Sequence, residues 1–210
     1  MSSVNKMHSQ GGKPSGWMGL LIGRLMNLLH GSIYKWALER VSVNDDSVIL
    51  DIGCGGGKVV KLLSNRASQG KVYGLDHSPE MVRLSNKTNR SSIAKGIVDI
   101  SQGSVTRLPY ADEQFSLVTA FETIQFWPDI NSNLDEVRRV LKSPGTFLIA
   151  NRYPPADSKW SGFLKLKNEN DYKEKLNMAG FKDVSIDTSS RKGWILAIAR
   201  IGNKKDTRKK

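Results

Sequence analysis

The stretch SVILDIGCGGGKVVKLL, residues 47 to 63, holds four glycines within five residues, between an apolar run and a helix-like pattern. The apolar run Val48–Ile52 has the length and the β-branched content of a strand that is buried on both faces, as in a parallel sheet. Apolar residues from Val59 to Leu63 follow at helical spacing. The glycines are therefore predicted to form a strand-to-helix turn, where a ligand can approach backbone N–H groups closely.

The spacing of the glycines separates two classes of cofactor. A dinucleotide-binding loop needs the pattern G-x-G-x-x-G, so that a pyrophosphate can sit on the N-terminus of the helix. Counted from Gly53, the third glycine of that pattern would fall on Lys58. Here Asp51 instead precedes the alternating glycines Gly53, Gly55 and Gly57. A carboxylate at this point repels a pyrophosphate and suits a ligand that carries an ammonium group.

A second marker follows in GKVYGLDHSPEMV, which predicts a strand over Lys71–Leu75 that ends at Asp76. An acid at the end of the second strand can accept hydrogen bonds from both hydroxyls of a ribose. Ser78 and Pro79 have the chemistry of a helix N-cap and of a first helical residue. We interpret Asp76 as a ribose ligand, beside the alternative that it only ends the strand.

The alternation of strands and helices continues along the chain. It predicts helices over 81–95 and 133–142 and strands over 97–101, 115–121 and 145–150. Strands that alternate with helices of this length indicate right-handed crossovers and a doubly wound parallel sheet of the α/β class. DYKEKLNMAGF then predicts a last helix, closed by Gly180, and two final strands, KDVSIDTSS and GWILAIARIG, are joined by a short turn.

Residues 46–200 together resemble the class I S-adenosylmethionine-dependent methyltransferases of the small-molecule type, similar to methyltransferase domains 11 and 25. The helix, turn and fifth strand in EVRRVLKSPGTFLI also resemble this family. The resemblance implies a Rossmann-like, seven-stranded, mostly parallel sheet in the order 3-2-1-4-5-7-6, with the last strand antiparallel. It implies an enzyme that uses S-adenosylmethionine as its cofactor.

The resemblance also implies which residues contact the cofactor. They are the loop residues Asp51, Gly53, Cys54, Gly55 and Gly57, then Asp76 at the ribose, His77 and Met81 beside the adenine, and Ser104, Val105 and Phe121 in the segment that closes over the adenine and enters the fourth strand. Much of the family has an acid for the adenine amino group where this chain has Ser104, whose hydroxyl accepts more weakly. Cys54 is interpreted as a small residue that fits the turn, not as a nucleophile.

Methyl transfer from a sulfonium needs the sulfur, the methyl group and the acceptor in line, and it needs a base only if the acceptor must lose a proton. Glu122, after the fourth strand, is the one candidate to orient or deprotonate an acceptor, and a structural role for it stays open. Four aromatic residues are candidates for an apolar acceptor pocket: Trp17, Trp127, Tyr153 and Trp160. The sequence contains no cluster of residues with the spacing of metal ligands.

The chain of 210 residues is expected to contain three parts. Residues 1–45 form an N-terminal flap and cap helix, residues 46–202 the methyltransferase domain, and residues 203–210 a basic disordered tail. The flap covers Met1 to about Gly19, and a helix from Tyr34 onward packs on the sheet. A peripheral membrane role for the apolar helix that carries Arg24 is an alternative.

The formal net charge of +12 raises the question of nucleic acid, but the basic residues are scattered and favour a solvated surface. A single cysteine excludes a disulfide framework, and the absence of a long apolar run predicts a soluble, cytoplasmic protein with no transmembrane segment. The favoured partner is a small-molecule acceptor. The alternatives are a nucleic-acid (RNA) methyltransferase, a nicotinamide-dependent oxidoreductase and a cofactor-binding protein without catalysis.

Overall fold

The computed structural model describes residues 31–153, 162, 164–189 and 193–202. The predicted flap with Trp17, the pocket candidate Trp160 and the predicted basic tail lie outside the described residues. Seven strands form one sheet in the order β3-β2-β1-β4-β5-β7-β6. β7 runs antiparallel to both of its neighbours, β5 and β6, which confirms the predicted fold class.

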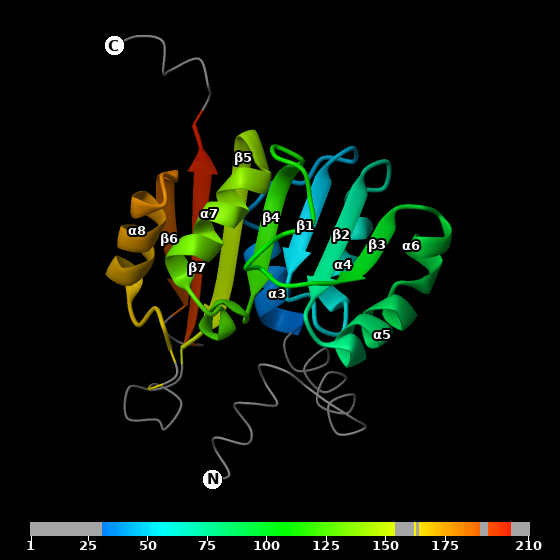
Figure 1. The fold of residues 1–210 in the computed structure, drawn as a ribbon, viewed down its shortest axis with the longest axis horizontal. Helices are drawn as coiled ribbons and strands as arrows, with labels where there is room; N and C mark the ends of the chain where they lie inside the picture. The colour runs from blue at the N-terminus through cyan, green and yellow to red at the C-terminus, as the bar shows by residue number, and fades with distance from the viewer. Residues whose placement is uncertain (1–30, 154–161, 163, 190–192, 203–210) are drawn as a thin grey trace. The chain divides into compact units, whose positions relative to one another are not determined.

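The chain divides into two compact units, residues 1–104 and 105–210. The strands of the first unit are β1 (Val48–Ile52), β2 (Lys71–Asp76) and β3 (Val98–Gln102), and its helices are α3 (Gly31–Leu38), α4 (Lys58–Ser64), α5 (Pro79–Thr88) and α6 (Arg90–Ala94). Figure 1 shows the three strands side by side, and their pairings are parallel. The apolar run that predicted β1 is buried over its last four residues.

Helix α3 belongs to the core of the first unit. Ile33, Tyr34, Ala37 and Leu38 are buried. The guanidinium of Arg66 donates a hydrogen bond of 2.5 Å to the carbonyl oxygen of Leu38 and so fixes the end of the helix. The helix that was expected from Tyr34 onward therefore exists, although it begins at Gly31 and ends at Leu38.

The prediction of a single helix over residues 81–95 is wrong, because the structure has two helices that meet at Asn89. Asn89 has φ −107° and ψ 12°, which is outside the helical range. Its side-chain Nδ2 donates to the carbonyl oxygens of Ser85 and Gly57, at 2.9 and 3.0 Å. An asparagine side chain that bonds to backbone groups competes with the helix ladder, and this explains the break.

The second unit contains β4 (Phe115–Phe121), β5 (Leu141–Arg152), β6 (Lys182–Ser189) and β7 (Trp194–Ile201), with the short 3-10 helix η1 (Ile124–Phe126) and the helices α7 (Ile130–Val140) and α8 (Glu169–Met178). β4 is parallel to β5, and α7 and α8 contact each other and the strands β5, β6 and β7 (Figure 1). In the described part of the chain, no helix has the length and apolar character needed to cross a membrane.

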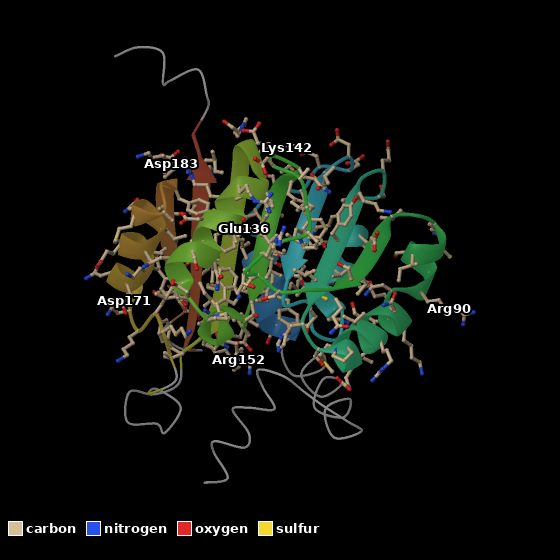
Figure 2. The ribbon with its side chains drawn as sticks, viewed as in Figure 1. Arg90, Glu136, Lys142, Arg152, Asp171 and Asp183 are labelled. Atoms are coloured by element: carbon tan, nitrogen blue, oxygen red, sulfur yellow. The ribbon has the colours of Figure 1, made fainter. Side chains whose placement is uncertain are left out.

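Strand β5 is longer than the predicted strand over 145–150, and α7 ends earlier than predicted. Leu141 already pairs with Phe115, so the chain leaves the helix after Val140 and enters the sheet directly. Figure 2 shows Lys142 and Arg152 at opposite ends of β5. The extension matters for the site because it carries Asn151 and Arg152 to the carboxyl end of the sheet.

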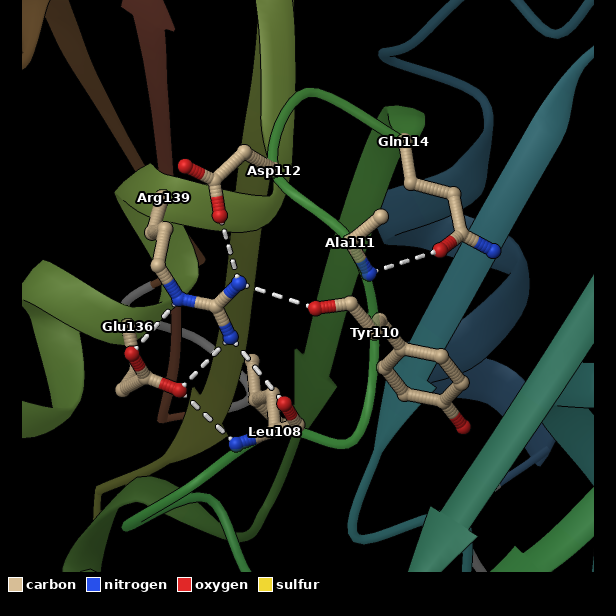
Figure 3. A network of polar contacts seen from close by, with 7 residues as sticks. All are labelled: Leu108, Tyr110, Ala111, Asp112, Gln114, Glu136 and Arg139. Atoms are coloured by element: carbon tan, nitrogen blue, oxygen red, sulfur yellow. Dashed lines mark hydrogen bonds and ion pairs between the residues drawn. The ribbon is translucent and has the colours of Figure 1, made fainter.

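A polar network ties the loop before β4 to helix α7 (Figure 3). Arg139 donates from Nε and Nη2 to the Glu136 carboxylate, from Nη1 to Asp112 and to the Tyr110 carbonyl, and from Nη2 to the Leu108 carbonyl, at 2.7 to 3.0 Å. Glu136 in turn accepts from the Leu108 N–H at 2.8 Å. All five N–H donors of the guanidinium are thereby used.

Candidate cofactor and acceptor sites

The glycine loop between β1 and α4 has the backbone shape that the sequence predicted. Gly53, Gly55 and Gly57 have positive φ angles of 70°, 50° and 79°. L-residues with a side chain rarely adopt this region, so glycine is favoured at each of these points. The N–H groups of Gly53 and Cys54 donate to the Leu75 carbonyl, at 2.8 and 3.0 Å, and this joins the loop to the end of β2.

The floor of the loop is formed by residues that sequence reasoning missed. A Cβ atom on Gly57 would lie 2.4 Å from Ser85 Oγ and 2.5 Å from Asn89 Nδ2, so no side chain fits there. Asn89 is buried and bonds to the Gly57 carbonyl. Asn89 and Gly57 are 32 residues apart, and no sequence pattern links an asparagine at a helix break to a distant loop.

Asp76 is the acid that the structure brings to the glycine loop. Its Oδ2 accepts from the Gly55 N–H at 2.9 Å, and its Oδ1 accepts from the Ser78 N–H at 2.9 Å. Burial raises the pKa of Asp76, while the hydrogen bonds from Ser78 and Gly55 oppose that shift. His77 Nδ1 lies 3.7 Å from Asp76 Oδ1. Since a carboxylate has about four acceptor positions, both oxygens keep capacity for hydroxyl groups of a ligand.

Two further residues of the loop are buried. Asp51, at the end of β1, is 1% exposed, and Cys54 packs below the loop with its Sγ 3.8 Å from Ser85 Oγ. Burial, followed by the carboxylates of Asp76 and Asp51, raises the pKa of the Cys54 thiol well above its usual value. A protonated, buried thiol is a poor nucleophile, which agrees with the interpretation of Cys54 as a small residue in a tight turn.

The remaining cofactor candidates of the first unit lie directly after β2, in α5 and after β3. His77 is exposed, and its carbonyl accepts from Gln102 Nε2 at 3.2 Å. Met81 is buried in the first turn of α5, where its N–H donates to the N-cap hydroxyl of Ser78 at 3.4 Å. Ser104 is exposed and is the last residue of the unit. The cofactor roles of these residues stay predictions.

In the second unit, Val105 is buried ahead of β4 and Phe121 is buried at the end of that strand. Glu122 follows with a φ of 55°, a conformation that a residue with a side chain seldom adopts. Its Oε1 accepts from the Arg152 N–H at 2.9 Å, and its Oε2 lies 3.7 Å from Arg152 Nε. The carboxylate of Glu122 therefore joins the ends of β4 and β5, and its proposed action on an acceptor stays a prediction.

The two described aromatic candidates for the acceptor pocket have different environments. Trp127 is buried and stacks on Phe147, with ring centroids 6.3 Å apart. Tyr153 is half-buried after β5, and its hydroxyl donates to the Leu166 carbonyl at 3.3 Å. Trp127 therefore contributes to the core, while Tyr153 reaches from the core toward the surface.

Tyr172, which sequence reasoning missed, forms a buried polar cluster with Asn151 and Tyr153. Asn151 Nδ2 donates to Tyr172 Oη at 2.6 Å, and the rings of Tyr172 and Tyr153 lie edge to face with their centroids 6.5 Å apart. Burial raises the pKa of Tyr172 to about 12 and raises that of Tyr153 further. Asn151 Oδ1 is buried with no hydrogen-bond partner. No sequence pattern links Asn151 to Tyr172, which lies 21 residues further along the chain.

Comparison with known proteins places this arrangement among methyltransferases. Residues 50–149 match a family model described as a methyltransferase domain. The YrhH protein of Bacillus subtilis is 29% identical over 119 residues, which cover 57% of this chain and 65% of YrhH. Demethylmenaquinone methyltransferase of Lactobacillus johnsonii is 28% identical over 182 residues, which cover 72% of this chain and 75% of that enzyme.

Solved structures support the same fold. The S-adenosylmethionine-dependent methyltransferase of Aquifex aeolicus superposes with a TM-score of 0.75 at 17% identity, over 87% of this chain and 98% of that chain. At this level of identity the superposition shows the fold alone. Among its curated relatives, the chain spans between 46% and 75% of the length of four that it matches.

Proposed function

Because the chain belongs to the class I S-adenosylmethionine-dependent methyltransferases, we propose that it transfers a methyl group from S-adenosylmethionine to a small-molecule acceptor. The observation that carries the proposal is the buried Asp76 carboxylate, bonded to the backbone of a glycine loop with three positive φ angles. Such a cofactor needs an acid that accepts hydrogen bonds from its ribose hydroxyls and a loop whose glycines let it approach the backbone closely.

The residues around the loop fit this cofactor. Asp76 accepts from the backbone N–H groups of Gly55 and Ser78, and the remaining lone pairs suit the two ribose hydroxyls. A Cβ atom built on Gly55 would meet nothing closer than 4.0 Å, so the space beside this glycine is open to a ligand. Asp51 supplies a carboxylate near the loop for the ammonium group of the cofactor's amino-acid part.

When bound, the cofactor supplies an electrophilic methyl group on a positively charged sulfur. The protein then has to hold the acceptor in line with that methyl group and to keep water out. Correct positioning of two reactants can lower a barrier by about 7 to 11 kcal/mol. In this proposal Glu122, tied to the end of β5 through Arg152, holds the chain around the acceptor in one geometry.

A small aromatic acceptor is favoured over a macromolecule. The Lactobacillus johnsonii relative is named for a quinone acceptor, demethylmenaquinone. At the carboxyl end of β5, the half-buried ring of Tyr153 lies edge-on to the ring of Tyr172, with centroids 6.5 Å apart. Aromatic side chains of this kind pack well against aromatic ligands.

The cofactor part of the proposal is tested by calorimetry with S-adenosylmethionine on the full chain and on Asp76→Ala. Loss of hydrogen bonds to a charged acceptor should weaken binding by about 1.5 to 3 kcal/mol. Asp99→Ala, which changes an exposed acid on β3 of the same unit, should leave the affinity unchanged. Equal affinities of Asp76→Ala and the unaltered chain would contradict a ribose at Asp76.

The acceptor part is tested with methyl-labelled cofactor and a panel of acceptors. The panel contains a prenylated naphthohydroquinone, simple phenols, amines and bulk RNA. We expect label in small aromatic molecules. Label in RNA alone, with a steep dependence on salt, would support the nucleic-acid alternative instead. Cofactor binding without transfer to any member of the panel would favour the non-catalytic alternative.

A further inference from the structure

Basic side chains gather on three adjoining helices of the first unit. α4, α5 and α6, with the C-cap residue of α6, carry six basic residues and a single acid, Glu80. In the second unit, α7 carries two acids and two arginines, and α8 carries three acids and two lysines. Positive charge is therefore concentrated on one group of helices. We call the six residues the basic face: Lys58, Lys61, Arg83, Lys87, Arg90 and Lys95.

Packing brings these residues together, although they are scattered along the sequence. Asn89, between α5 and α6, donates from Nδ2 to the carbonyl of Gly57 at the start of α4, at 3.0 Å. At the other end of α4, Ser64 Oγ lies 3.4 Å from Ser92 Oγ of α6. α4 and α5 also contact each other and β2. The three helices therefore form one layer, and their outer sides adjoin.

The charges of the basic face have few partners. Lys58 is half-buried and the other five side chains are exposed. Figure 2 shows Arg90 directed away from the ribbon. Arg83 pairs with Glu80 at 3.2 Å. Within the described part of the chain, the other five basic side chains form no ion pair and no hydrogen bond. Their charges are therefore available to an anionic partner.

The chemistry of the basic face favours an anionic lipid bilayer over nucleic acid. Proteins that bind single strands add aromatic side chains on which the bases stack, and α4, α5 and α6 contain none. Duplexes are read by an element that enters a groove, whereas these residues lie along the sides of three helices. A bilayer presents its phosphates over a broad surface. Clusters of about four to eight Lys and Arg residues on amphipathic helices are typical of binding to acidic lipids.

The basic face suits electrostatic attachment without insertion into the bilayer. Among the described residues, Met178 on α8 is the one exposed large apolar side chain, and it lies outside the basic face. Attachment through the face must therefore depend on charge, and salt should weaken it.

We propose that the basic face docks the protein on the surface of an anionic lipid bilayer. Lys58 directly follows the glycine loop, and α5 begins three residues after Asp76. Docking therefore holds the candidate cofactor loop beside the bilayer, into which apolar aromatic molecules partition. The docking itself does not depend on the proposed function, and only its use in reaching an apolar acceptor does.

Vesicle flotation with the full chain tests the docking. Vesicles of phosphatidylcholine alone are compared with vesicles of an equimolar mixture of phosphatidylcholine and phosphatidylglycerol. We expect binding to the mixture, its release at high salt, and no binding to phosphatidylcholine alone. Equal binding to both kinds of vesicle, or binding to neither, overturns the proposal. Binding of duplex RNA through the basic face by a chain that ignores the vesicles would assign the face to nucleic acid and also overturn it.

A triple variant tests the basic face itself. Lys61→Gln, Lys87→Gln and Arg90→Gln together should weaken binding to the mixed vesicles about 100-fold, because each basic residue near an anionic surface contributes about fivefold. All three residues are exposed, so the variant should fold as the wild-type chain does. Unchanged binding in this variant contradicts the proposal.

The matched control removes the same number of positive charges from exposed positions of the second unit: Arg138→Gln, Lys142→Gln and Lys173→Gln. This control variant should weaken binding by less than about threefold, because its charges lie outside the basic face. If the two triple variants weaken binding equally, the net charge of the chain decides the binding, and the proposal is wrong.

A second measurement locates the contact in a chain that keeps all its basic residues. The single cysteine of the chain, Cys54, is buried, so an introduced surface cysteine can be labelled selectively with a fluorophore. Lipids with a spin-labelled headgroup should quench a label on Ser91→Cys, on α6, more strongly than one on Asn177→Cys, on α8. Equal quenching contradicts the proposal. Failure of the proposed function would appear separately, as a chain that binds the vesicles and transfers no methyl group.

Discussion

Two polar clusters in the unit of residues 105–210 differ in how completely their hydrogen-bonding groups are used. The Arg139 cluster of Figure 3 uses every N–H of its guanidinium, and its partners come from α7 and from the loop before β4. The cluster of Asn151, Tyr172 and Tyr153 is more deeply buried, yet it leaves Asn151 Oδ1 without a partner.

This difference suggests that the two clusters have different roles, one in stability and the other in binding a ligand. A saturated network holds its parts in one geometry and has nothing left for a ligand, so its loss should appear as lost stability. An unsaturated cluster contributes less to stability and keeps the capacity to bind. Variants of the two clusters should therefore change different measurements.

The largest effect on stability is expected from Arg139→Gln. The change leaves the Leu108 and Tyr110 carbonyls and the Glu136 carboxylate without their shared donor, and we expect a loss of about 3 kcal/mol in the free energy of unfolding. Urea denaturation measures it. Arg138→Gln, the exposed neighbour on α7, should change stability by less than about 0.5 kcal/mol. Equal losses in both variants would remove the distinction between the two clusters.

A smaller effect is expected from Tyr172→Phe, which removes the hydroxyl that accepts from Asn151. Loss of that partner should cost about 1 to 2 kcal/mol, measured by thermal unfolding. The variant also tests how the free energy of unfolding changes at alkaline pH. Tyr172 has a pKa of about 12 in the folded chain and an ordinary tyrosine about 10, so the folded chain keeps a proton that the unfolded chain releases.

The sign of this dependence follows from proton linkage. Stability from the neutral Tyr172 is fully present below about pH 10 and is lost as the pH rises toward 12. Tyr172→Phe should therefore lose less stability over this range than the wild-type chain. Tyr73→Phe, on β2, should keep the wild-type slope, and an unchanged slope in Tyr172→Phe would contradict the burial argument.

The smallest effect is expected at acidic pH, where protonation of Glu136 in the Arg139 cluster lowers the free energy of unfolding. The hydrogen bond from Arg139 lowers the pKa of Glu136, so its contribution is present above the unfolded pKa of about 4.3 and is lost as the pH falls through the lower folded value. In Glu136→Gln, the free energy of unfolding that is lost as the pH falls should be smaller than in the wild-type chain by about 0.5 to 1 kcal/mol. Asp135→Asn, an exposed neighbour, is the control. If Glu136→Gln loses as much stability at acidic pH as the wild-type chain, the ion pair of Glu136 and Arg139 contributes nothing.

The elements of the fold could be predicted where the signal is local. β1 (Val48–Ile52) and β4 (Phe115–Phe121) have the bounds that their apolar runs predicted, and Ser78 caps α5 through a bond to the Met81 N–H. The final pair of antiparallel strands followed from turn chemistry and alternation. Each of these features depends on residues within a few positions of one another.

Local patterns failed where a distant partner decided the outcome. The helix after Ser78 breaks at Asn89 because that side chain reaches Gly57, and α7 ends at Val140 because Leu141 pairs with Phe115. The strength of an apolar run or of a helix-forming stretch carries no information about such a partner. Tertiary contacts therefore set these boundaries.

The sequence by itself determined the alternating strands and helices, the glycine loop and the acid at the end of β2, because period, caps and backbone freedom are properties of short segments. Only the tertiary structure decided which polar groups meet. Asn151 with Tyr172, and Arg139 with the Leu108 carbonyl, are brought together by sheet pairing and helix packing across 21 and 31 residues. Hydrogen bonds need atoms within about 3 Å, and no sequence pattern fixes a distance of that kind between segments so far apart in the chain.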